Sequence, residues 1–368
     1  MNPNLNKQFQ VFVYFIMALL LSSCGSTAAI LSTPIENIDL TPLKIEALTE
    51  VEKKEWSHLD LKTDTVPGVS LNRAYKEIVK PKGKTIIVAV IDSGIDIDHE
   101  DLEGQIWVNT DEIPNNGIDD DANGYIDDIN GWNFLGDADK EQLEYVRLIA
   151  SGDTSNPRFT EAQELLSKEL EKTNRDIAQY ENILKPIKDA HAGIVKYLNN
   201  PNYTKEDVEA ILTPDWDILR YVRVIKQSYD FGFDNIDALI DDLETGLKTF
   251  NTRLDYNLNL AYDGRSVVGD NPDDLQDRAY GDNNVRARHG RTHGTHVSGI
   301  IAAKRHNGIG INGAANRVKI MAIRNTPSGD EYDKDVALGV YYAVDNGAKV
   351  INMSFGKQFS PHSNWVRD

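Results

Sequence analysis

The stretch I-I-V-A-V-I-D-S-G-I-D, residues 86–96, decides the fold of this chain. It opens with an uninterrupted apolar run rich in β-branched residues, which is typical of a strand buried on both faces of a parallel sheet. Asp92 follows that run directly, and the carboxyl ends of strands are where open α/β sheets gather ligand-binding and catalytic groups. Taken alone, Asp-Ser-Gly after a strand is also compatible with an ordinary turn.

Two later segments predict further strands of the same sheet, V-K-I-M-A-I at 318–323 and K-V-I-N-M-S at 349–354. Residues 335–346 between them have helical periodicity and end at a C-cap signal, Asn-Gly. The expected apolar face of that helix consists of Val336, Val340, Tyr341 and Val344. Because helices alternate with buried strands, we expect an α/β fold whose parallel sheet carries helices on both faces.

A second motif, H-G-T-H-V-S-G-I-I-A-A, begins at His293 and predicts a helix of small residues with a histidine in its first turn. One nitrogen of such an imidazole can take a proton from a nucleophile, while the other donates to a buried carboxylate that sets the tautomer. His289, His293 and His296 also have spacings found among zinc ligands. No glutamate stands at the general-base position of H-E-x-x-H, which argues against a zinc hydrolase.

Four segments together resemble one family: V-I-D-S-G-I-D-I-D-H-E-D-L at 90–102, H-G-T-H-V-S-G-I-I-A at 293–302, N-G-I-G-I-N-G-A-A at 307–315 and V-I-N-M-S-F-G at 350–356. They are similar to the signatures of the subtilases, the subtilisin-like serine peptidases. The order of Asp before His along the chain is also that of this family. The resemblance covers residues 56–136 and 263–368 but not the middle of the chain.

The resemblance implies a subtilisin-like fold and hydrolysis of polypeptide substrates without a catalytic cofactor. Asp92 would orient the imidazole, and His293 would act as general base and then as general acid. Substrate would add as a strand along an edge formed by Ser354, Phe355 and Gly356.

The serine nucleophile of the family lies in a G-T-S-M-A motif, and this sequence contains no match to it. We therefore expect the peptidase domain to be incomplete at its C-terminus and the chain as given to be inactive, as a truncated form of an active serine endopeptidase. The alternative is an inactive fragment or pseudoprotease that acts as a binding module through a helical insertion at residues 138–262.

The N-terminus predicts a targeting segment rather than a segment of the fold. An apolar run too short to span a bilayer leads into Leu-Ser-Ser-Cys, which resembles a bacterial lipoprotein box ending at Cys24. Cys24 is the only cysteine, so it cannot form a disulfide within the chain. We expect a lipid on Cys24 that anchors the protein extracytoplasmically in a bacterial cell envelope; an ordinary signal peptide with a chance cysteine is the alternative.

Residues 138–262 interrupt the peptidase pattern with helical stripes. The stripes consist of Leu166, Leu170, Thr173, Ile177, Tyr180, Leu184 and Ile187, with Pro186 disturbing the end, then Ile218, Tyr221, Val222 and Ile225, then Ile236, Ile240, Leu243, Leu247, Phe250 and Leu254. They predict an antiparallel helical hairpin with an extra helix. Such a hairpin could bind a partner, pack only on its own chain, or cover the catalytic cleft.

The expected organisation is a signal peptide (1–23), a lipidated tether (24–55), a first peptidase segment (56–137), the insertion (138–262) and a second peptidase segment (263–368).

The formal net charge of −19 argues against a nucleic-acid partner, which requires clustered Lys and Arg. The acidity includes D-D-D-A-N-G-Y-I-D-D at 119–128, which fits the spacing of a calcium loop. The expected ligands are Asp119, Asp121, Asn123, the main chain of Tyr125, and Asp127. Asn130 stands where an EF-hand has Glu, so the pattern predicts either a structural calcium site or an acidic turn.

Overall fold

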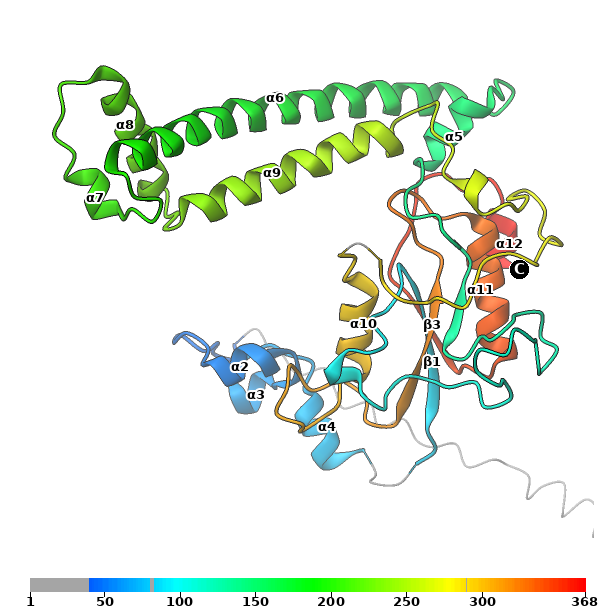
Figure 1. Ribbon diagram of the computed structural model, residues 1–368. Coiled ribbons are helices and arrows are strands. Elements are labelled where there is room, and N and C mark those ends of the chain that lie inside the picture. The colour runs from blue at the N-terminus through cyan, green and yellow to red at the C-terminus, as the bar shows by residue number, and fades with distance from the viewer. Residues whose placement is uncertain (1–39, 80–82, 289) are drawn as a thin grey trace, which may run out of the picture.

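The computed structural model describes residues 40–79, 83–288 and 290–368. Its centre is a sheet of four parallel strands, in the order β2-β3-β1-β4 (Figure 1). The strands are β1 (Ile86–Asp92), β2 (Gly131–Asn133), β3 (Val318–Arg324) and β4 (Val350–Met353). The register pairs Asp92 at the end of β1 with Arg324 at the end of β3. The expected α/β class with a parallel sheet is confirmed.

Apolar side chains cover both faces of the sheet because residues of a strand point alternately to opposite sides. Ala89 and Ile91 of β1 pack under α11 (Asp333–Asp345). Val88 and Val90 of the same strand pack under α10 (His293–Ala302). Each of the four side chains is at most 5% exposed, so β1 is the buried centre of the domain.

The face of α11 that meets the sheet is only partly the expected one, since Val336 is buried and Val340 packs against the core as expected. Tyr341 and Val344 are exposed, whereas Leu338 and Tyr342 are buried. The helix lies close to the sheet through Gly339, where a Cβ would be only 3.3 Å from Ile323. The predicted face was chosen from the bulky apolar residues of the helix. The absence of a side chain at Gly339 lets the helix approach the sheet closely, and this approach favours burial of the face that contains Gly339.

Helices α5–α9 lie between the two segments of the sheet domain, and we call them the insertion. Figure 1 shows α6 and α9 side by side, projecting from the body on the side of α10, with α7 and α8 at the far end. Their bounds are α5 (Glu144–Ser151), α6 (Phe159–Leu198), α7 (Lys205–Glu209), α8 (Trp216–Asp230) and α9 (Ile236–Thr252), followed by the π-helix η3 (Arg253–Asn257). The rings of Tyr180 and Phe250, one from each long helix, are 5.2 Å apart.

Pro186, expected to disturb the end of the first stripe, lies inside the long helix, and α6 continues beyond it to Leu198. A proline removes one intrahelical hydrogen bond. Beyond it, however, Ala190 and Ile194 are fully buried in a second apolar core made with α7, α8 and α9. That burial offsets the lost bond, because tertiary packing contributes most of the stability of helices in proteins.

Residues 40–79 form short helices beside α10, and they include the end of the expected tether. Lys44 N–H donates to the Thr65 carbonyl, and the side-chain amide of Asn312, a residue of the sheet domain, donates to the Glu55 carboxylate.

The remaining elements are α2 (Glu50–Glu55), η1 (Trp56–His58), α3 (Leu61–Asp64), α4 (Leu71–Glu77), η2 (Glu100–Leu102), η4 (Arg265–Val267) and α12 (Ser363–Arg367). Cys24 and the expected signal peptide lie outside the described residues. In the portion of the chain that is described, no helix has the length and apolar character needed to cross a bilayer.

Candidate active site

Asp92 and His293 come into contact although 201 positions separate them in the sequence. The imidazole Nδ1 lies 2.9 Å from both carboxylate oxygens of Asp92. Because an ionised carboxylate only accepts hydrogen bonds, Nδ1 carries the proton and donates it. The Asp92 side chain is 2% exposed and the His293 side chain 57% exposed. The described residues offer no hydrogen-bond partner to Nε2, so the basic nitrogen is open to a reactant.

Two glycines allow this contact. Gly94, directly after the strand, has a φ of +103°, and a Cβ there would be 2.8 Å from the Arg286 carbonyl. Gly294, directly after the histidine, would place a Cβ 2.3 Å from the Gly94 carbonyl. Any side chain at Gly294 would therefore push α10 away from the end of β1 and separate the imidazole from Asp92.

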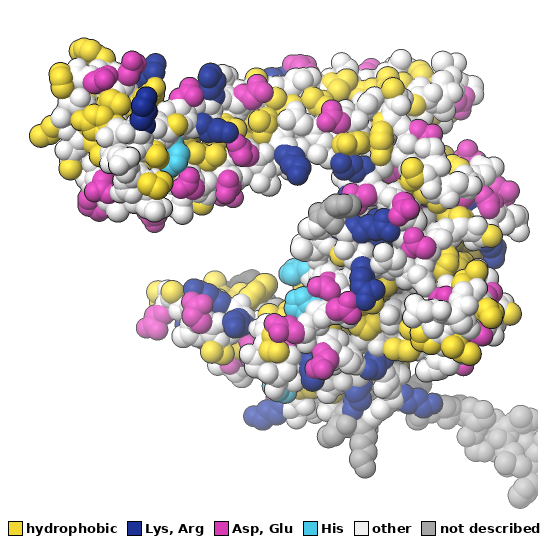
Figure 2. All heavy atoms as spheres, viewed as in Figure 1, with side chains coloured by type: hydrophobic (Ala, Val, Ile, Leu, Met, Phe, Trp, Pro, Cys, Tyr) yellow, Lys and Arg dark blue, Asp and Glu magenta, His cyan; other side chains and the backbone are white. Residues whose placement is uncertain are grey.

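The segment after β3 joins the site at the same strand end. The N–H groups of Asn325 and Thr326 donate to the Asp92 carbonyl at 2.9 and 3.2 Å. The strand ends of β1, β3 and β4 thus meet at one edge of the sheet, as the parallel register requires. Figure 2 shows histidine side chains exposed in the recess between the insertion and the body.

The expected substrate edge, Ser354–Gly356, directly follows β4. Ser354 and Gly356 are exposed, and Phe355 packs partly against the core beneath α11. Within the described residues, the main-chain groups of 354–356 make no hydrogen bond. An exposed segment with free N–H and C=O groups can pair with an added strand.

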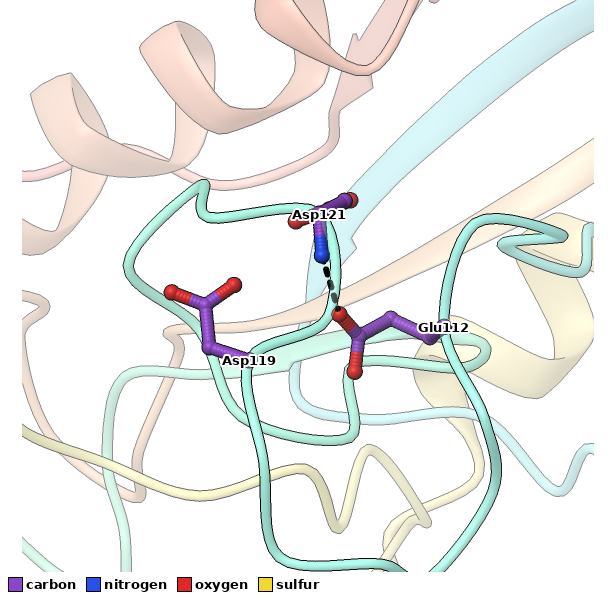
Figure 3. A group of neighbouring side chains, drawn as sticks. All are labelled: Glu112, Asp119 and Asp121. Carbon is purple, nitrogen blue, oxygen red and sulfur yellow. Dashed lines mark hydrogen bonds between the residues drawn. The ribbon is translucent and has the colours of Figure 1, made fainter.

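The acidic loop brings carboxylates together, as Figure 3 shows for Glu112, Asp119 and Asp121. One oxygen from each lies within 4.8 Å of the others. Calcium–oxygen distances of about 2.3–2.6 Å place ligand oxygens at such separations. Burial raises the pKa of Glu112, and the nearby carboxylates Asp128 and Asp121 act in the same direction. An ion of charge two would relieve this repulsion, so these residues fit calcium.

The other expected ligands lie differently. Asp127 accepts hydrogen bonds from the N–H groups of Asn116 and Gly117 with its two oxygens. The side-chain amide oxygen Oδ1 of Asn123 accepts from the N–H of Tyr125, whose ring packs in the core 5.0 Å from the Trp132 ring. Glu112 was missed because it precedes the D-x-D-x-N-G pattern. The signal that could have found it is another acid a few residues before that pattern, on the same loop.

A comparison with protein-family models matches the chain from residue 83 to residue 367 with the model of the subtilase family. The chain therefore belongs to the subtilase family.

Individual relatives match over shorter segments. The chain is 36% identical over 122 residues to a cell wall-associated protease of Bacillus subtilis, a match that covers 33% of this chain and 12% of that protein. It is 45% identical over 76 residues to thermitase of Thermoactinomyces vulgaris, covering 20% and 27%. It is 26% identical over 211 residues to an extracellular basic protease of Dichelobacter nodosus, covering 47% and 35%. The matches thus span about a third or less of each relative.

Proposed function

We propose that the protein is a serine endopeptidase in which Asp92 and His293 are two members of an Asp-His-Ser triad. The observation that carries the proposal is the pair of 2.9 Å contacts between the His293 Nδ1 and the buried Asp92 carboxylate, in a chain of the subtilase family. The serine is assigned to no residue of this sequence. Polypeptides are the substrates, and Ser354–Gly356 pairs with their main chain.

In this mechanism Asp92 keeps the proton of His293 on Nδ1, so that Nε2 is the base. Nε2 takes the serine proton as the serine oxygen attacks the carbonyl carbon of the scissile bond. The same proton then passes to the leaving amine as the carbon–nitrogen bond breaks. Water repeats both transfers on the acyl-enzyme and releases the acid.

A fluorophosphonate probe applied to the complete translated product of the gene tests this proposal. We expect one serine to be labelled, with labelling lost in His293→Ala. Peptide hydrolysis that is chelator-sensitive and leaves no labelled serine would contradict a triad. Peptide binding with neither hydrolysis nor labelling would instead indicate a non-catalytic binding module.

We also propose structural calcium in the loop that contains Glu112, Asp119 and Asp121. When bound, the ion would neutralise these clustered carboxylates and hold the loop that leads into β2. It takes no part in the catalytic steps above.

An extracytoplasmic location is proposed from the relatives named as cell wall-associated and extracellular proteases. A lipid on Cys24 would then hold the protein at a membrane surface. Metabolic labelling with a fatty-acid analogue, compared between wild type and Cys24→Ala, tests that attachment.

The insertion is proposed to cover part of the cleft. At the base of α9, a hollow of about 700 Å³ is lined by Thr252, Tyr256, Lys140, Ser328 and Arg291. Arg291 is two residues before His293, and it forms a 2.9 Å ion pair with Asp139 on the segment that leads into the insertion. A substrate that approaches the imidazole from this side would therefore pass the insertion.

A further inference from the structure

A buried ionic cluster joins the base of the insertion to the residue that follows the proposed substrate edge. Glu144 and Arg147 lie on α5, and Lys357 comes directly after Gly356. The Glu144 Oε2 atom lies 2.5 Å from the Arg147 Nη2 and 2.8 Å from the Lys357 Nζ. The three side chains are only 5–11% exposed. We call Glu144, Arg147 and Lys357 the clamp.

The clamp also holds the segment after β3. Arg147 donates to the carbonyls of Asp330 and Glu331 at 2.9 and 3.2 Å. Lys357 donates to the Glu331 carbonyl at 2.6 Å. The cluster therefore fixes the separation between the segment that follows β3 and the segment that follows β4.

Neighbouring contacts hold the chain after Lys357 to the insertion as well. Phe359 is 4% exposed and packs against Tyr145 of α5. Arg158, beside the start of α6, lies over the Phe359 ring and donates to the Gln358 carbonyl at 2.8 Å. Residues 354–356 are consequently a free edge between two fixed points, the pairing of β4 with β1 and the clamp.

Ionic charges in the clamp are balanced at close range. Burial opposes ionisation of Glu144, but the adjacent Arg147 and Lys357 outweigh it and lower its pKa. Asp333 lies 3.0 Å from the Lys357 ammonium and neutralises the remaining positive charge. A buried ion pair of this kind contributes little net stability over apolar packing, but it fixes geometry firmly, because removing one partner leaves the other charge buried and unpaired.

We propose that Glu144, Arg147 and Lys357 are positioning residues for the substrate edge, so that the insertion base helps to build the peptide-binding groove. This inference rests on the proposed peptidase function. The clamp holds residues 354–356 ready for pairing, which reduces the ordering cost of peptide binding. It touches neither Asp92 nor His293, so its effect belongs to the binding of extended substrates and not to proton transfer.

The test compares two fluorogenic peptides cleaved by the complete gene product. One peptide is long enough to pair along 354–356, and the other carries only the residues next to the scissile bond. In Glu144→Gln we expect KM for the long peptide to rise about tenfold with kcat nearly unchanged, and less than about twofold change for the short peptide. Arg158→Ala removes the contacts of Arg158 with Gln358 and Phe359. Because the Arg158 side chain is 42% exposed, this variant should fold, and it should raise KM for the long peptide as well.

The matched control is Glu171→Gln on α6, which removes one partner of an exposed pair with Arg175 and should leave both KM values unchanged. Equal losses for long and short peptides, or unchanged KM in both Glu144→Gln and Arg158→Ala, would overturn the positioning role and leave the peptidase proposal intact. A wild-type protein that cleaves neither peptide would overturn the peptidase proposal, and this inference with it.

Discussion

At the scale of the residue, the carboxylate of Asp92 is defined by its few contacts. It accepts from the Ser93 N–H at 2.7 Å and from the Ser93 hydroxyl at 3.1 Å, and it faces His293 on its other side. The contacts with Ser93 fix the Asp92 carboxylate, and His293 is the ring that it can orient. Orienting this ring requires a side chain that only accepts hydrogen bonds, as an ionised carboxylate does.

Replacing Asp92 by Asn tests that requirement. An amide at this position can donate toward Nδ1 and favour the wrong tautomer, so we expect kcat of the complete protein to fall by about 10⁴-fold, the size of loss typical when the aspartate of a serine-protease triad becomes asparagine. Initial rates on a peptide substrate measure the loss. Asp98→Asn, which alters an exposed pair with Arg286, is the control and should retain wild-type rates. A loss of less than about tenfold in Asp92→Asn would contradict the orienting role.

Glu141 is a second residue with a testable environment. Burial raises its pKa from 4.5 to about 7 in spite of Arg147, and its Oε1 atom has no hydrogen-bond partner. The folded protein keeps this proton to about pH 7, whereas the unfolded chain releases it near pH 4.5. Stability should therefore decrease as pH rises between these values, by about 3 kcal/mol for this group.

Glu141→Gln should remove that decrease, because glutamine has no proton to lose. Urea unfolding at about pH 5 and about pH 8 measures it. Wild type should lose stability between the two pH values by about 3 kcal/mol more than the variant does. Equal pH slopes in the two proteins would show that the Glu141 carboxyl is not held protonated.

At the scale of the element, the loop from Glu112 to Asp128 concentrates acids without an ion pair to Lys or Arg among the described residues. Asp128 is fully buried, and burial raises its pKa although Tyr342 donates to it. Repulsion between these carboxylates destabilises the folded loop, and a bound cation would remove that repulsion.

We expect calcium at about a hundred times its dissociation constant to stabilise the protein by about 2.7 kcal/mol, and chelation to reverse the effect. Thermal unfolding with calcium or with chelator measures this difference. Glu112→Gln should weaken the response, whereas Asp111→Asn, an exposed neighbour on the same loop, should preserve it. A melting temperature that calcium does not change would exclude the site.

At the scale of the whole molecule, the insertion has two regions that pack differently. Its base, around α5, packs on the segments that follow β3 and β4, whereas its far end has an apolar core of its own. Lys188 of α6 and Glu244 of α9 form a 2.5 Å ion pair between these regions. The helices are close enough there for a short turn to connect them.

Deleting residues 189–243 and joining the two helices by a short glycine-containing turn would remove the far end while keeping the base. If the insertion covers the cleft, turnover of a folded protein substrate should rise about three- to tenfold while turnover of a short peptide stays constant. Both rates are measured on the complete gene product. Unchanged turnover of the protein substrate would refute the covering role.

Much of the candidate active site could be predicted from local sequence. The apolar run before Asp92 predicts a buried strand, the small residues after His293 predict a helix, and each motif contains one of the two candidate residues. The outer limits of α6 and the buried face of α11 could not be predicted in this way. Pro186 is tolerated because distant residues pack beyond it, and Gly339 selects a face that bulky residues alone do not indicate.

The sequence by itself determined the parallel α/β sheet, the two catalytic candidates and the subtilase family, because strand periodicity and motif spacing are local properties. Only the tertiary structure decided that Glu112 lies with Asp119 and Asp121, and that Glu144 and Arg147 of the insertion meet Lys357. These contacts join residues that no single motif links. Which buried charges become neighbours depends on how elements pack, and no spacing within a single segment encodes that.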